Sequence, residues 1–146
     1  LNIIEKLNKP VLVGIHIKKN KKLPSGETIE EIVKKYRTNN WLGLILSCVS
    51  LEIINENLTS LKHYDIPFGF KANLWGKDEP LPVNKFNKSK PNEIGQNPNI
   101  VLGSRKDVTG EIFYNFSKNL KDKGATILGG CCETNASHIS ALARLK

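Results

Sequence analysis

Four short segments of the chain are apolar almost throughout, and each is followed by residues with the spacing of an amphipathic helix. Such strands are typical of a parallel sheet that helices cover, whereas half-exposed strands alternate between apolar and polar positions. Helices that alternate with buried strands form right-handed crossovers, either in a doubly wound sheet or in a (β/α) barrel. The sequence therefore predicts an α/β protein with strands at residues 11–17, 42–46, 68–74 and 125–128.

Capping residues indicate where the intervening helices begin. Thr28 and Glu31 match a capping box, in which each side chain bonds to the backbone N–H of the other residue. Later helices are predicted to begin after Ser50, Thr109, and either Asn135 or Ser137. Their spacing predicts apolar faces that include Ile112 and Ile139 in the last two helices.

The segment at about 76–108 carries most of the prolines and little periodicity, which predicts a long loop excursion. An excursion of this length is either a functional lid or a region whose elements the pattern does not reveal. Trp75, at its start, either covers a substrate together with the loop or anchors the loop as an ordinary buried aromatic residue.

Four βα units make half of a (β/α)8 barrel and leave two unpaired sheet edges. Completing such a barrel takes either a missing N-terminal half or a partner chain, so we expect a homo-oligomer or a longer protein. The chain opens at Leu1 and contains no methionine, which also favours a longer protein. Residues 1–146 are thus interpreted as one unit, the C-terminal half of a barrel.

The net charge of +8 comes mainly from lysines that are scattered along the chain, apart from a cluster in the segment 18–22. This distribution argues against nucleic-acid binding, which needs a basic patch. The sequence lacks the roughly 18 consecutive apolar residues that would span a membrane. Its three cysteines are too few for a disulfide scaffold, which favours a reducing, cytoplasmic location.

The positions of the cysteines predict a shared site. Cys48 follows the second predicted strand and the adjacent Cys131 and Cys132 follow the fourth, so all three are expected at the rim where barrel enzymes carry their active sites. Three thiolates around Zn²⁺ leave the fourth tetrahedral position open for catalysis. Gly129 and Gly130 are predicted to break the strand and turn the backbone toward the metal. Inert buried thiols, a redox-active dithiol and a structural zinc site are the alternatives.

The sequence around the adjacent cysteines resembles the closing motif of homocysteine S-methyltransferases. The matching residues are Gly129, Gly130, Cys131, Cys132, Thr134, His138, Ile139, Ala141 and Leu142. In similar enzymes the third metal ligand is a cysteine at the end of the sixth barrel strand, which corresponds to Cys48 in the segment 43–48. The family usually has Asn before this cysteine and Gly after the pair, where this chain has Ser47 and Glu133.

The resemblance implies a zinc-dependent enzyme that transfers a methyl group from a small donor to the thiol of homocysteine, giving methionine. The substrate sulfur would occupy the open metal position as a thiolate and attack the methyl group. One alternative is another thiol or selenol acceptor. The other is a metal-binding half-barrel without catalysis, because similar enzymes place further acidic substrate contacts in the first half of the barrel.

Four further polar residues have less specific predicted roles. Asn73 aligns with an asparagine of similar enzymes and is predicted either to position substrate or to cap a turn. His16, near the end of the first strand, is a candidate substrate contact or a satisfied core histidine. His138 is expected to pack or to cap a helix, and His63 to lie on the surface.

Overall fold

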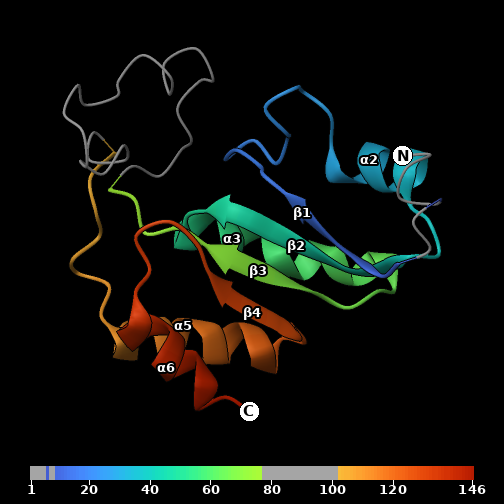
Figure 1. Ribbon diagram of the computed structural model, residues 1–146. Coiled ribbons are helices and arrows are strands. Elements are labelled where there is room, and N and C mark those ends of the chain that lie inside the picture. Colours follow the sequence, from blue (N-terminus) through green and yellow to red (C-terminus); the bar gives the residue numbers. More distant parts are fainter. Residues whose placement is uncertain (1–5, 7–8, 77–101) are drawn as a thin grey trace.

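The computed structural model describes residues 6, 9–76 and 102–146 of the chain. All four predicted strands form within these residues, and they make one parallel sheet in the order β1-β2-β3-β4 (Figure 1). The elements are β1 (Val11–Ile15), α2 (Ile29–Tyr36), β2 (Trp41–Val49), α3 (Leu51–Asn57), the 3₁₀ helix η1 (Leu58–Tyr64), β3 (Phe68–Ala72), α5 (Gly110–Asp122), β4 (Ile127–Gly130) and α6 (Ala136–Ala143). This α/β arrangement is compatible with part of a (β/α) barrel.

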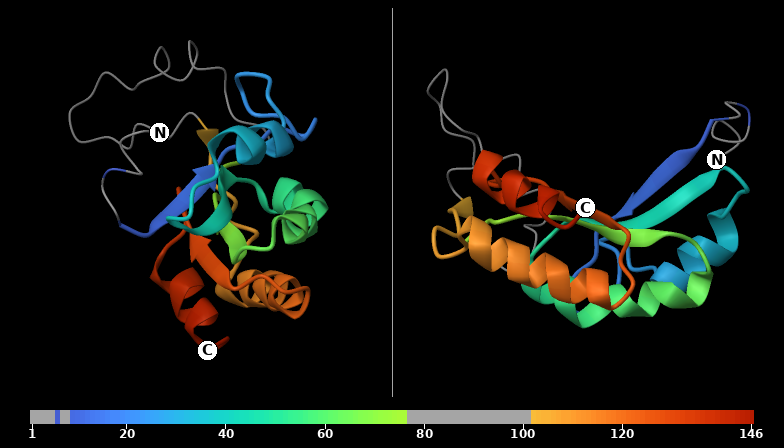
Figure 2. Two further views of the ribbon diagram at one scale, coloured as in Figure 1. Left: turned by 90° about the vertical axis from the view of Figure 1, so that its right-hand side faces the viewer. Right: turned by 90° about the horizontal axis from the view of Figure 1, so that it is seen from below.

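Helices α2, α3 and α5 cover one face of the sheet, which we call the covered face (Figure 2). The core lies between them and the strands, where Leu44, Leu46 and Phe70 are fully buried together with Ile54 and Phe113. Alternate residues of a strand point to opposite faces, so these strand residues supply the covered face alone. Helix α6 packs against α5 and β4.

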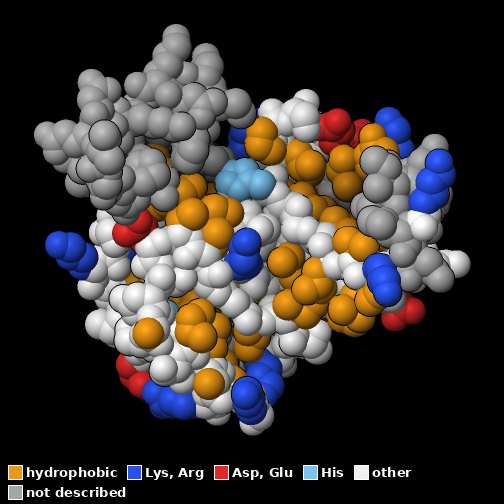
Figure 3. All heavy atoms as spheres, in the orientation of Figure 1, with side chains coloured by type: hydrophobic (Ala, Val, Ile, Leu, Met, Phe, Trp, Pro, Cys, Tyr) orange, Lys and Arg blue, Asp and Glu red, His pale blue; other side chains and the backbone are white. Residues whose placement is uncertain are grey.

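The opposite face of the sheet, which we call the open face, turns toward the viewer in Figures 1 and 3. None of the described helices lies across β1, β2 and β3 on this face. Gly14, Ile45, Gly69 and Ile127 are paired side by side across the four strands, so that small and large residues alternate within one layer. Leu12, on the same face, is 47% exposed. Hydrophobic side chains are visible over the strands from this side (Figure 3).

The predicted helix starts are confirmed. Thr28 and Glu31 form both bonds of the capping box, and Asn135 rather than Ser137 is the N-cap of α6. Ser50 and Thr109 each accept a bond from the third residue of their helix.

Four predictions about the strands and helices need correction. Strands β1 and β3 each end two residues earlier than expected, and β2 is longer. Strand β4, expected at 125–128, both begins and ends two residues later. The helix after Ser50 tightens into η1 at Leu58, where Ser60 Oγ donates to Asn57 O and the side chain thus competes with the helical backbone pattern. Ile112 and Ile139, expected on buried faces, are 49% and 48% exposed because Phe113 and Ala141 face the core instead.

The fourth correction concerns Gly129 and Gly130, which lie within β4 and do not break it. Neither has a positive φ, so neither makes a sharp turn. Gly130 is required for close packing, because a Cβ atom there would lie 2.4 Å from Thr134 Oγ1.

The middle of the long excursion, residues 77–101, lies outside the described part of the chain. Its two ends lie side by side, since Gly76 N donates to Leu102 O at 3.1 Å and Arg105 N to Leu74 O at 2.8 Å. Trp75 is 8% exposed, as expected for an anchor of the loop, and no observation places it over a substrate. Within the described residues, no helix is both long and apolar enough to cross a membrane.

The layer of alternating glycine and isoleucine predicts that alanine substitutions at two glycines of neighbouring strands differ sharply in their effect on stability. A Cβ atom on Gly69 would lie 1.7 Å from Ile127 O, whereas one on Gly129 would be 3.6 Å from its nearest neighbour, an ordinary contact. We expect Gly69→Ala to lower the free energy of unfolding by at least about 1–3 kcal/mol, as overpacking does, and Gly129→Ala to change it little. Urea unfolding of both variants measures this. Equal stabilities would contradict the register of β3 and β4.

Candidate metal centre

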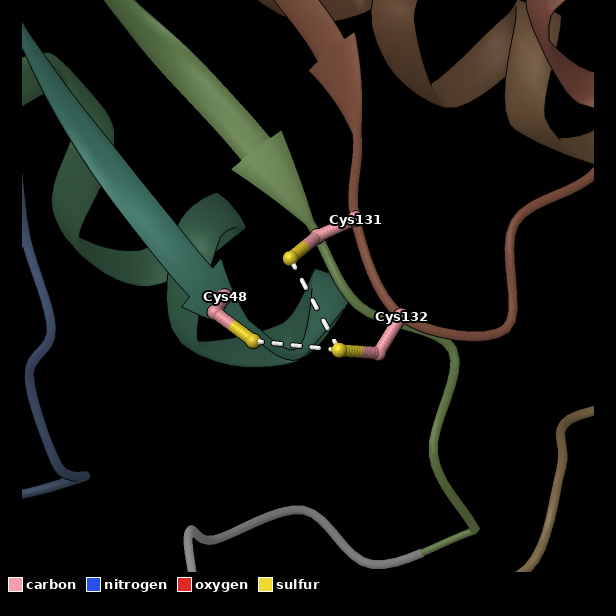
Figure 4. A group of neighbouring side chains, drawn as sticks. All are labelled: Cys48, Cys131 and Cys132. Atoms are coloured by element: carbon pink, nitrogen blue, oxygen red, sulfur yellow. Dashed lines mark hydrogen bonds between the residues drawn. The ribbon is translucent and has the colours of Figure 1, made fainter. Parts of the chain in front are cut away.

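The three cysteines come together at the carboxyl edge of the sheet (Figure 4). Cys48 is the penultimate residue of β2, and Cys131 and Cys132 directly follow β4. Strand β3 lies between these two strands, as predicted, so the ligands approach one another across its end.

The sulfur atoms have the spacing of ligands to one tetrahedral ion. Cys48 Sγ and Cys132 Sγ are 3.7 Å apart, Cys131 Sγ and Cys132 Sγ are 3.8 Å apart, and all three lie within 4.8 Å of one another. Zinc–sulfur bonds of about 2.3 Å in a tetrahedron put two sulfurs about 3.8 Å apart. The cluster can therefore bind a metal ion, and its soft thiol donors fit Zn²⁺. The histidines and acidic groups of the described residues add no further ligand within this spacing.

Backbone hydrogen bonds past the end of β3 hold the adjacent pair. Cys131 N donates to Ala72 O at 2.7 Å, and Leu74 N donates to Cys132 O at 2.9 Å. The chain then turns after the pair, where Thr134 N and Oγ1 both donate to Cys131 O and Glu133 has a φ of +64°. The turn therefore lies after the cysteines and not at the glycines before them.

Cys48 takes its position through a β-bulge. Ser47 pairs with Lys71 and Val49 pairs with Ala72, so Cys48 is the extra residue on β2, and its φ is +59°. A bulge re-aims one side chain without ending the strand. Here it turns the Cys48 thiol toward the other two cysteines. The sequence gives no signal for this bulge, since non-glycine residues seldom adopt a positive φ.

Asn73 supports Cys48. Its side chain is 5% exposed, and its Nδ2 donates to Cys48 O at 2.7 Å while its Oδ1 accepts from Trp75 N at 3.3 Å. The predicted turn-capping role is thus confirmed, and the role in substrate positioning stays a prediction.

The histidines take different positions. His138 caps α6 through Nδ1 and is bonded to Val108 O through Nε2, as expected of a packing residue, and His63 is exposed. His16 lies at the end of β1 with Nδ1 3.2 Å from Ser47 O. Its Nε2 is buried and has no hydrogen-bond partner, so it is not a satisfied core histidine.

Lys71 was not predicted as a site residue. It is exposed in the middle strand, between buried Phe70 and Ala72, and pairs with Ser47 and Gly129. A lysine among apolar residues of a buried strand is the sequence signal that could have indicated it.

The environment of the thiols disfavours their charged form in the absence of metal. Burial raises the pKa of the Cys48 thiol, and hydrogen bonding and charge from the other two cysteines raise it further. Burial also raises the pKa of the Cys132 thiol, with the charge of Cys131 as the next cause. Both thiols therefore keep their protons at neutral pH until a cation offsets the repulsion.

These raised pKa values predict that zinc uptake releases protons. At pH 7 we expect about two protons or more per zinc ion, since both thiols must ionise to bind. The apparent zinc affinity should rise with pH, because fewer protons then compete for sulfur. Calorimetric titration in two buffers with different ionisation enthalpies measures the count. Zinc binding without proton release would show that the thiols are already ionised.

The comparisons with known proteins agree with the geometry. The family model described as homocysteine S-methyltransferase matches residues 1–145, nearly the whole chain. A comparison with curated proteins finds no match. The match extends over β1 to α6 and all three cysteines, and the chain therefore belongs to the homocysteine S-methyltransferase family.

Proposed function

We propose that this chain carries the zinc site of an enzyme that transfers a methyl group to the thiol of homocysteine, giving methionine. The observation that supports this most strongly is the sulfur spacing. Two of the pairs are 3.7 and 3.8 Å apart, close to the separation in a zinc tetrahedron, and all three sulfurs lie within 4.8 Å of one another. Family membership independently suggests methyl transfer of the homocysteine S-methyltransferase type.

Cys48, Cys131 and Cys132 would hold the ion and leave one corner for the substrate sulfur. When bound there, zinc would hold that sulfur as a thiolate near neutral pH. Three protein thiolates give the centre a net charge near −1, and this charge keeps the substrate sulfur electron-rich. The sulfur's lone pair forms the new bond to the methyl carbon, and the bond from that carbon to the donor breaks.

Residues around the ligands would fix the geometry. Asn73 restrains the backbone of Cys48, and the bond from Cys131 N to Ala72 O restrains the adjacent pair. We propose that Asn73 acts mainly through this support, since both of its polar side-chain atoms already bond to the backbone. We propose His16, at the end of β1, as a second candidate for contact with substrate.

The open face favours a specific second candidate, a metal-binding unit that catalyses nothing by itself. Leu12 is 47% exposed there, and within the described residues β1 and β4 each pair on one side alone. We propose that these four βα units form the C-terminal half of a (β/α)8 barrel, completed by an N-terminal half or by a second copy. Another thiol or selenol acceptor is compatible with the same metal site.

Zinc stoichiometry tests the shared site. We expect the reduced chain to bind about one zinc ion tightly, and Cys48→Ser or Cys132→Ser to weaken binding by more than the 10–100-fold that loss of an outer-shell bond typically costs. His63→Ala, which removes an exposed histidine, is the control and should bind zinc as the parent does. The measurement is competition with a chelating dye. Zinc binding that does not depend on Cys48 would refute the site.

An assay of methyl transfer to homocysteine by the zinc-loaded protein then separates the two candidate functions. Zinc binding together with methyl transfer supports the enzyme, whereas zinc binding without it supports the non-catalytic unit.

A further inference from the structure

Three backbone hydrogen bonds lead from the adjacent cysteines along the two described ends of the excursion. Leu74 N donates to Cys132 O at 2.9 Å, and Arg105 N donates to Leu74 O at 2.8 Å. Val108 N then donates to Arg105 O at 3.2 Å. The segment that leaves the excursion is therefore bonded to Cys132 through Leu74 alone at this point.

His138 closes this path into a ring. Its Nε2 is bonded to Val108 O at 2.8 Å, and its Nδ1 accepts from Asn135 N at 3.0 Å. Residues 132–135 are continuous in sequence, so the path returns to Cys132. The ring thus joins the second cysteine of the adjacent pair, both described ends of the excursion and the start of α6.

The two partners of His138 determine its tautomer. Val108 O can only accept, so Nε2 carries a hydrogen, and Asn135 N–H donates, so Nδ1 has a lone pair. The neutral imidazole therefore uses both of its nitrogens. His138 is 5% exposed, and its ring packs edge-on against Phe113 with the ring centroids 5.5 Å apart. A buried side chain with both polar atoms bonded holds its two partners in a fixed relation.

The turn between the cysteines and α6 carries this restraint to the ligands. Thr134 N and Oγ1 donate to Cys131 O at 3.2 and 2.6 Å, and the next residue, Asn135, is the one that His138 holds. The turn is thus fixed at Cys131 O, at Cys132 O and at Asn135 N. Movement at either end of the ring would shift the backbone from which both thiols project.

We propose that His138 is a positioning residue for the metal site. By closing the ring it fixes the turn that carries Cys131 and Cys132 against the segment 105–108, so that metal binding and the fixing of this segment favour each other. His138 does not contact the ion, because both of its nitrogens are already bonded. The inference rests on the proposed function, in which these cysteines hold zinc.

Amide hydrogen exchange of the reduced full chain, with and without zinc, tests this coupling. We expect zinc to slow exchange at Arg105 N and Val108 N about ten-fold, the lower end of what residues that support metal ligands contribute to affinity, because coupling is reciprocal. Gly124 N, which donates to Lys121 O at 2.8 Å in the turn beyond the other end of α5, is the control. Its exchange should not change. Unchanged exchange at Arg105 and Val108 in a chain that binds zinc, or equal slowing at Gly124, would overturn the proposal.

Two variants test the part of His138 itself. His138→Phe keeps a planar ring against Phe113 and removes both hydrogen bonds, so zinc affinity should fall about ten-fold. His138→Gln keeps an acceptor for Asn135 N, as glutamine does at the third position of a capping box, and should recover part of that affinity. Glu111→Gln removes the charge of an exposed ion pair with Arg144, which joins α5 and α6 outside the ring, and should bind zinc as the parent does. Affinity is measured by competition with a chelating dye, at a temperature at which circular dichroism shows each metal-free protein to be folded.

Equal zinc affinity of the parent and of folded His138→Phe would show that His138 only stabilises α6, and would overturn the proposal while leaving the metal site intact. An equal loss of affinity in Glu111→Gln would indicate a general loosening of α6 and would also overturn it. If His138→Phe does not fold, the exchange experiment on the parent chain decides by itself. If the parent binds no zinc, the proposed function fails together with this inference.

Discussion

The hydrogen bonds that continue the sheet beyond the end of β3 hold together the edge that carries the three cysteines. Cys131 N bonds to Ala72 O on one side of this strand, and Asn73 Nδ2 bonds to Cys48 O on the other. Thiols from residues 83 positions apart in sequence, Cys48 and Cys131, thereby come within 4.8 Å of each other. The parallel order β2-β3-β4 is what makes this possible, because it directs all three carboxyl ends to the same edge.

Assembling the site costs free energy of folding, which metal binding would offset. Cys48 and Glu133 both have left-handed backbone conformations, each of which costs about 1–3 kcal/mol for a residue other than glycine. Burial and mutual repulsion also raise the pKa values of Cys48 and Cys132. A cation among the three sulfurs would remove this repulsion, and ligation would hold the strained backbone in place. Strain at such a position is typical of a functional site.

Much of the fold and the grouping of the three cysteines could be predicted from the sequence because both depend on local patterns. Apolar runs gave the four strands, and the pair Thr28 and Glu31 gave a helix start. Cys48 was expected just after its strand and is the penultimate residue of β2, but the expected carboxyl edge is the one at which the cysteines meet. The bulge at Cys48 could not be predicted, since it depends on pairing between β2 and β3. The role of Gly130 was misjudged for a similar reason: its contact with Thr134 exists only after the chain has turned.

The central claim is that the cysteines leave one zinc corner for a substrate sulfur, and X-ray absorption at the zinc edge tests it most directly. The zinc-loaded chain should show three sulfur neighbours at about 2.3 Å and one lighter neighbour, which a fourth sulfur replaces when homocysteine is added. A zinc shell with fewer than three sulfurs, or one that homocysteine leaves unchanged, would contradict the account.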